Sequence, residues 1–309
     1  MSRHSEDVWK LAVLRAALGD ARGPRVFARG AELAVDTMLY RHAQTLGLAP
    51  EGPARVAWRA HLAGTIGRRI QLQRVLQMLP EGVDVAVLKG EPLARQIYED
   101  PWVRRSGDID LLVRLEDARA CGRALERQGF LPAHGPQPEP WRYNQWAWGH
   151  PETGLLVELH WAIAAPEVPS PPAEELLARR VPIALGEGLE VEALAPAHAF
   201  LLVCYHFHHH AGFLKGLVDV AAWLDRFGRW GALEAGLARA RQLGVYGVCQ
   251  WPLWAISELA GRRVPGADGA AVRARAMGAW TARLVEGVLG RAEAIGGGDA
   301  LAFKIQEVF

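Results

Sequence analysis

The chain has 309 residues, half of them hydrophobic, and its formal net charge at pH 7 is +1. This length allows a sizeable core and more than one domain. The balanced charge excludes a global electrostatic attraction to nucleic acid or to an anionic membrane, and it argues against a long nucleic acid as a partner.

The N-terminal segment and the cysteines indicate a compartment. Residues 1–10 are polar and mixed in charge, without the apolar stretch of a signal peptide. No run approaches the roughly 20 apolar residues that span a bilayer. The three cysteines lie far apart and indicate neither a disulfide framework nor a zinc site. We therefore expect a soluble cytoplasmic protein with no membrane partner.

Residues 1–80 are predicted to form an N-terminal helical region. Apolar residues recur at helical spacing from residue 5 to residue 79, with breaks at 47–53 and 80–82. The last of these helices, over 54–79, is long, and we expect it to lie against the sheet that follows. The apolar side chains available for that packing are Ile66, Ile70, Leu72, Val75, Leu76 and Leu79.

Residues 81–195 are predicted to form an α/β core. Helices are expected over Glu91–Tyr98 and Glu116–Gln128, the second ended by Gly129. Turn residues separate two pairs of strands, which predicts hairpins over 141–161 and 181–194. The expected strands are Val83–Leu88, Asp108–Val113, Trp141–Trp148, Leu155–Trp161, Val181–Leu185 and Leu189–Leu194.

Residues 196–309 return to helical periodicity and are predicted to form a C-terminal helical domain. With the preceding regions this order of elements predicts an α+β fold, in which helical regions flank the α/β core. The expected helices are Ala197–Phe207, Leu214–Phe227, Leu233–Leu243, Val245–Leu259 and Ala270–Leu289.

Two carboxylates stand at the start of the second predicted strand. Asp108 and Asp110 are two residues apart, so both would project from the same face of an extended strand. Adjacent anions repel one another unless a cation lies between them, and Mg²⁺ binds one or two carboxylates together with water and substrate phosphates. The pair therefore indicates metal-assisted phosphoryl chemistry. On spacing alone, a turn or a helix-capping pair is an alternative.

Two further features add to this pattern. Gly90 follows a predicted strand and precedes a predicted helix, and such a junction presents backbone N–H groups to an anion. In the strand at 155–161, Glu158 lies mid-strand, where an unpaired charge is costly, and His160 shares its face. Glu158 is a candidate third carboxylate, with a water-facing edge-strand glutamate as the alternative.

These motifs resemble a known family. The segments Leu88-Lys89-Gly90, Arg104 to Val113 and Val157 to Trp161 are similar to the uncharacterised nucleotidyltransferase family of the polymerase-beta-like superfamily. The resemblance covers roughly residues 80–225. It implies a small mixed sheet that carries a triad of carboxylates, here Asp108, Asp110 and Glu158, as metal ligands and catalytic residues.

The resemblance also implies nucleotide-binding residues. Gly90 matches the small residue of a phosphate loop, although Glu91 follows it where the wider superfamily usually has serine. Lys89 is then a candidate point charge for the triphosphate, with a surface lysine as the alternative. Arg104 matches a family arginine whose fork suits a phosphate, with a salt bridge that orients Asp108 as the alternative.

The remaining candidates lie around the metal site or in the helical domain. His160 is a candidate neighbour of the metal ligands, or a packed histidine. Family members often have histidines near His210 and an Asp at the position of Asp219, which suggests that both help to close the nucleotide cleft. His206 and His210 are also spaced i, i+4, which can hold zinc on a helix, but no Glu follows His206 as in zinc proteases.

The sequence hypothesis is a nucleotidyltransferase dependent on Mg²⁺ or Mn²⁺, which moves NMP from an NTP to an unidentified acceptor. The acceptor is a small molecule, a peptide or protein, or an RNA end. One alternative is a protein of a biosynthetic operon that binds a nucleotide or a partner without catalysis. The other is a metallohydrolase built on the His206–His210 cluster. The sequence lacks a P-loop, a dinucleotide-binding glycine fingerprint and a G-x-S-x-G elbow.

Overall fold

The computed structural model describes residues 35–45, 52–133, 142–186, 188–209, 214–228, 231–260, 263–264 and 267. Contacts divide the described chain into two units. The first comprises residues 40–202 and contains the whole sheet, and the second comprises residues from 203 onward together with residues 35–39. The helix predicted over 270–289 and the first predicted helices, before residue 35, lie outside the described residues.

The first unit is built on a seven-stranded mixed sheet with the order β3-β4-β5-β2-β1-β7-β6. The pairs β2/β5 and β1/β7 are parallel and the other neighbours are antiparallel. Both predicted hairpins are present, as β4/β5 and β6/β7, and the α+β fold class is confirmed. The strands are β1 (Ala86–Val87), β2 (Ile109–Leu112), β3 (Leu131–Pro132), β4 (Gln145–Gly149), β5 (Leu156–His160), β6 (Val181–Gly186) and β7 (Leu189–Ala193).

Alternation along β2 and β5 separates a core face from a polar face. Ile109 and Leu111 of β2, and Val157 and Leu159 of β5, belong to one buried apolar cluster. Successive side chains of a strand point to opposite faces, so the residues between them face the other side. That other face carries Asp110 and, on β5, the acidic and histidine side chains discussed below.

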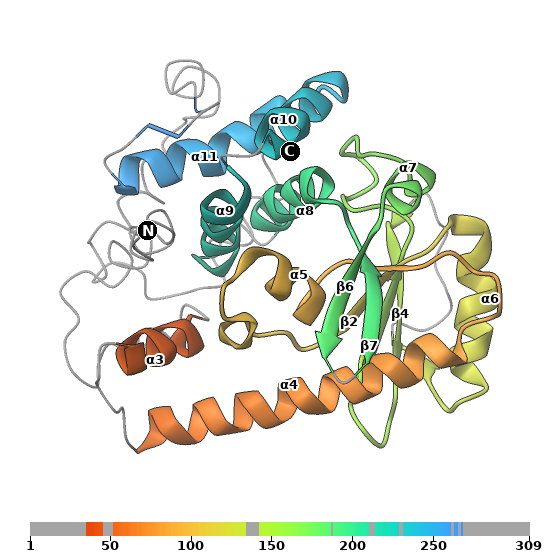
Figure 1. Ribbon diagram of the computed structural model, residues 1–309. Helices are drawn as coiled ribbons and strands as arrows, with labels where there is room; N and C mark the ends of the chain where they lie inside the picture. The colour runs from red at the N-terminus through yellow and green to blue at the C-terminus, as the bar shows by residue number, and fades with distance from the viewer. Residues whose placement is uncertain are drawn as a thin grey trace. The chain divides into compact units, whose positions relative to one another are not determined.

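The helices that lie wholly in this unit are α4 (Pro53–Met78), α5 (Gly90–Ile97), α6 (Leu115–Glu126) and α7 (Ala173–Ala178), and the short 3-10 helix η2 (Pro101–Val103) follows α5. Helix α4 runs beside the sheet, as expected (Figure 1). Its Leu72 and Val75 are buried in the same cluster as β2 and β5, but Ile66 and Ile70 are exposed and do not pack. The expectation for these two isoleucines was wrong because they lie on a different face of the helix.

Several elements differ from their predicted bounds. Strand pairing at β1 is limited to Ala86–Val87, and the strand predicted from Trp141 begins only at Gln145. Helix α7 was not predicted, although its apolar residues at 173, 176 and 177 have helical spacing and are buried. The turn η2 was missed as well; it is capped by Asp100, which accepts a hydrogen bond from the Trp102 backbone N–H at 3.1 Å.

A tight contact between α6 and β4 leads to a stability prediction. A Cβ atom on Gly122 would overlap the indole ring of Trp148, which is fully buried and donates a hydrogen bond to Glu126. We expect Gly122→Ala to destabilise the protein by about 2 kcal/mol, because overpacking outweighs the helix propensity gained.

Thermal unfolding measures this effect. The matched control is Gly67→Ala in α4, where an added Cβ meets nothing within 4 Å. That substitution should raise the midpoint of unfolding slightly, since alanine is the better helix former. Equal effects of the two substitutions would show that Trp148 can shift to make room.

The second unit is helical. Its elements are the C-terminal part of α8 (Pro196–His209), followed by α9 (Leu214–Phe227), α10 (Ala232–Gln242) and α11 (Tyr246–Ala260); the start of α3 (Asp36–Thr45) also belongs to it. Helix α9 packs closely against α8, since a Cβ on Gly216 would lie 3.0 Å from the Phe207 backbone. None of the described helices combines the length and the apolar character that a membrane crossing needs.

Candidate functional site

The parallel pairing of β2 with β5 places the acidic residues of the two strands side by side. Asp110 and Glu158 are direct partners in the register, and Leu112 is opposite His160. Since Glu158 and His160 are two residues apart on β5, their side chains share the face of the sheet to which Asp110 points. The two strands therefore bring Asp110 together with groups that are 48 and 50 residues further along the chain.

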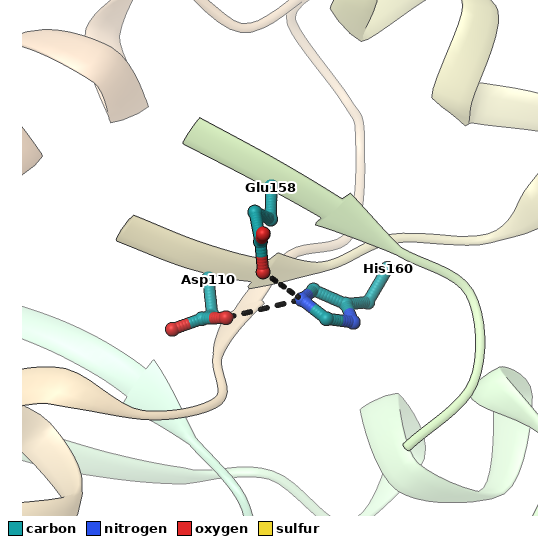
Figure 2. A group of neighbouring side chains, drawn as sticks. All are labelled: Asp110, Glu158 and His160. Atoms are coloured by element: carbon teal, nitrogen blue, oxygen red, sulfur yellow. Dashed lines mark hydrogen bonds and ion pairs between the residues drawn. The ribbon is translucent and has the colours of Figure 1, made fainter. Parts of the chain in front are cut away.

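The side chains of Asp110, Glu158 and His160 converge on one point (Figure 2). The His160 Nε2 atom lies 3.1 Å from Asp110 Oδ1 and 3.3 Å from Glu158 Oε2. One donor atom from each of the three residues lies within 4.8 Å of the others, and among the described residues this is the one such group of three. Asp110 and His160 are buried, and Glu158 is half-buried.

Lys89 approaches the same aspartate from β1. The backbone N–H of Leu88 donates to the Asp110 carbonyl at 2.9 Å, which sets the end of β1 beside β2. The Lys89 Nζ atom then forms an ion pair with Asp110 Oδ1 at 2.7 Å. Lys89 thus neutralises the central carboxylate, and its contact with a triphosphate stays a prediction.

The electrostatics of the group follow from burial and from these contacts. Burial raises the pKa of Asp110, but the His160 hydrogen bond and the Lys89 charge outweigh it and hold the pKa well below its usual value. Burial lowers the pKa of His160, yet hydrogen bonds to Asp110 and Glu158 raise it overall. Asp110 is thus held ionised, and a protonated His160 can stand between the two carboxylates.

Asp108 lies just before β2 and is half-buried. Burial, then the negative charge of Asp110 and, less strongly, that of Glu158 raise its pKa, while the Lys89 charge lowers it. The negative charges of Asp110 and Glu158 thus disfavour a further charge on Asp108, and a cation among the three carboxylates would relieve this repulsion.

Asp108 and Asp110 border a cavity at the end of the sheet where β2 begins. Gly90 and Arg104, two predicted nucleotide-binding residues, also line it. Gly90 opens α5 with φ +74°, a conformation that favours glycine, and Arg104 is buried. The full lining is Thr65, Arg68, Arg69, Leu72, Val87, Lys89, Gly90, Glu91, Pro92, Pro101, Arg104, Ser106, Asp108, Ile109 and Asp110.

Glu158 and His160 do not line this cavity; they lie beside Asp110 on β5. The structure thus brings Asp108, Lys89, Gly90 and Arg104 together around the cavity, and it joins Glu158 and His160 to them through Asp110. The roles assigned to these residues stay predictions.

Sequence reasoning missed the contribution of α4 and of the loop before β2. Arg68 and Arg69 of α4 line the cavity, as does Ser106, whose Oγ would lie 3.5 Å from a Cβ on Gly90. A hydroxyl from the loop before β2 therefore lies close to the Gly90 backbone. Gly64, one turn before Arg68 in a long helix, is a sequence signal that could have drawn attention to α4.

The donor set fits a divalent cation. Asp110 Oδ2 is buried and has no hydrogen-bond partner within the described part of the chain, so this carboxylate has an oxygen left for a ligand. Carboxylate oxygens suit Mg²⁺ and Mn²⁺, and an imidazole nitrogen suits Mn²⁺ better than Mg²⁺. A metal-bound nitrogen carries no proton, so a metal ion at His160 Nε2 and the protonated His160 exclude each other.

The candidate site residues of the helical domain either belong to the second unit or lie outside the described residues. Asp219 is buried in α9, and His210 is not among the described residues. A zinc site formed by His206 and His210 therefore stays an untested alternative. Next to them, His208 Nε2 donates a hydrogen bond to the Val248 carbonyl at 2.9 Å and its ring packs on Trp251.

We expect His208 to make the stability of the protein pH-dependent. Burial lowers its pKa from 6.5 to about 4, so the folded protein holds it neutral. The resulting stabilisation is complete above pH 6.5 and is lost as the pH falls from about 6.5 toward 4, because the unfolded chain takes up the proton first. We expect the midpoint of thermal unfolding to fall over this range.

A pair of variants checks this assignment. His208→Gln keeps a donor for Val248 but has no charge to gain, so its midpoint should fall less between pH 6.5 and 4. His209→Gln alters an exposed neighbour and should follow the wild type. Parallel curves for wild type and His208→Gln would assign the acid sensitivity to other groups.

Comparison of the chain with known proteins identifies a family that it matches. A family model described as "Uncharacterised nucleotidyltransferase" matches residues 24–262, which include every residue named in the site. A comparison with curated proteins found no match.

Proposed function

Since the chain belongs to the uncharacterised nucleotidyltransferase family, we propose that it moves NMP from an NTP to an acceptor with the help of Mg²⁺ or Mn²⁺. The family supports nucleotidyl transfer in general. The metal dependence is supported by one observation above all: Asp110, paired with Glu158 across parallel strands, keeps a buried carboxylate oxygen that has no hydrogen-bond partner among the residues that the structure describes.

Each residue has a task in this proposal. Asp108 and Asp110 hold the metal beside the cavity, and Glu158 completes the site from β5. A bound divalent ion would neutralise the triphosphate and lower the pKa of the attacking hydroxyl. The positive φ of Gly90 lets the first turn of α5 turn its backbone N–H groups toward the phosphates.

Cations around the cavity complete the binding of the nucleotide. Arg104 and Lys89 supply positive charge for the triphosphate. Lys89 has to leave Asp110 Oδ1 for this purpose, and a metal ion at that carboxylate would make the exchange favourable by replacing the ammonium charge.

The position of the label in ATP tests the reaction class. The protein is incubated with Mg²⁺, a cell extract as the source of acceptors, and ATP or another NTP labelled at either the α- or the γ-phosphate. Nucleotidyl transfer labels an acceptor from the α-position only. Label from the γ-position would indicate a kinase, and binding of Mg²⁺-ATP without any labelled product would favour the non-catalytic alternative.

A further inference from the structure

One face of α4 borders the cavity. Thr65, Arg68, Arg69 and Leu72 are spaced i, i+3, i+4 and i+7, so they form a single stripe along the helix, and all four line the cavity. Leu72 is buried in the same apolar cluster as residues of β2, so its packing holds this face of α4 in position relative to that strand. The long helix before the sheet thus forms a wall of the candidate site.

The two adjacent arginines on this stripe have different environments. Arg69 forms two hydrogen bonds with the carboxylate of Glu91, at 2.9 and 2.6 Å, which is a fork-to-fork ion pair. No carboxylate of the described residues lies within ion-pair distance of Arg68. Glu91 also accepts from Arg95 at 2.9 Å, so its charge is already compensated.

The absence of a side chain at Gly64 leaves space for the Arg68 guanidinium. A Cβ at Gly64 would lie 3.4 Å from one terminal nitrogen of Arg68 and 3.7 Å from the other. The guanidinium therefore folds back over the preceding turn, across a position without a side chain. A glycine inside a helix is less favourable than alanine, and here that glycine leaves room for the guanidinium.

The electrostatic environment of Arg68 suits an incoming anion. Burial lowers the pKa of its guanidinium, and the negative charge of Asp108 partly offsets this effect. The guanidinium stays charged, because arginine does not lose its proton in proteins. A partly desolvated cation without an ion-pair partner gains more from a bound anion than a hydrated one.

We propose that Arg68 binds the triphosphate tail of the nucleotide from the α4 wall of the cavity, which the metal-holding carboxylates Asp108 and Asp110 also line. This inference rests on the proposed function for the identity of the anion. The phosphates would then contact two sources of positive charge, the metal held at Asp108 and Asp110 and the guanidinium on α4. Bidentate contact with phosphate oxygens is the geometry that a guanidinium favours.

Inorganic tripolyphosphate is the probe that isolates this contact. Its binding to the full chain is measured by calorimetry in the presence of Mg²⁺ and compared with the binding of ATP. We expect Arg68→Gln to weaken both by roughly 10- to 100-fold, in the range of a charge-assisted hydrogen bond. Arg68→Lys should recover part of the loss, and Arg74→Gln, which changes an exposed arginine of the same helix, should bind within about twofold of the wild type.

The outcomes separate this inference from the proposed function. If Arg68→Gln binds tripolyphosphate as the wild type does, with an unchanged melting temperature, the inference is wrong whether or not the protein transfers nucleotides. Absence of tripolyphosphate binding by the wild type also overturns it. Binding that depends on Arg68 in a protein that labels no acceptor supports the inference and counts against the proposed function alone.

Discussion

Asp110→Asn is expected to lower nucleotide transfer by roughly 10³-fold or more, because the loss of metal stabilisation removes several kcal/mol from the transition state. Asparagine keeps the shape of aspartate and can still accept a hydrogen bond from His160, but it has no charge for a divalent cation. The measurement is the transfer of label from α-labelled ATP in Mg²⁺, together with the affinity for Mn²⁺ in the absence of nucleotide. Both should fall.

Stability has to be followed in the same variant. Asp110 pairs with Lys89 inside the protein, and removing one partner of a buried pair is destabilising. The melting temperature therefore shows whether the loss of transfer occurs in a folded protein. Glu190→Gln, which removes an exposed carboxylate from β7 of the same sheet, should leave transfer unchanged. A folded Asp110→Asn protein with full transfer would refute the proposed metal site.

Lys89→Met is expected to change two properties in opposite directions. Transfer should fall by about 10- to 100-fold, since the triphosphate loses a charge-assisted contact. The affinity for Mn²⁺ without nucleotide should rise, because the ammonium group and the metal ion compete for Asp110 Oδ1. Methionine keeps most of the length and apolar surface of the lysine stem.

This second prediction distinguishes a phosphate contact from a purely structural ion pair. A structural lysine would, when removed, lower the melting temperature and reduce metal affinity and transfer together. Lys215→Met, in α9 of the second unit, serves as a control for the loss of one lysine charge. A fall in Mn²⁺ affinity in Lys89→Met would contradict the proposed competition.

The sequence by itself determined the parts of the site that depend on local periodicity. The alternation of polar and apolar residues in 108–113 and 155–161 predicted which side chains share a face, and the observed core contains Ile109, Leu111, Val157 and Leu159. The positions of most helices and of both hairpins followed from spacing and turn residues as well. These features could be predicted because they depend on residues that are near one another in the chain.

Only the tertiary structure decided how separate segments meet. The register of β2 against β5 places Asp110 opposite Glu158, and nothing in either strand specifies the partner. Lys89, which follows β1, forms an ion pair with Asp110, whereas the sequence alone left open that it is a surface lysine. The packing of α4 places Arg68 in the lining of the cavity. Such contacts are set by how whole elements bury their apolar faces, and that packing joins residues too distant in the chain for any local pattern to reveal.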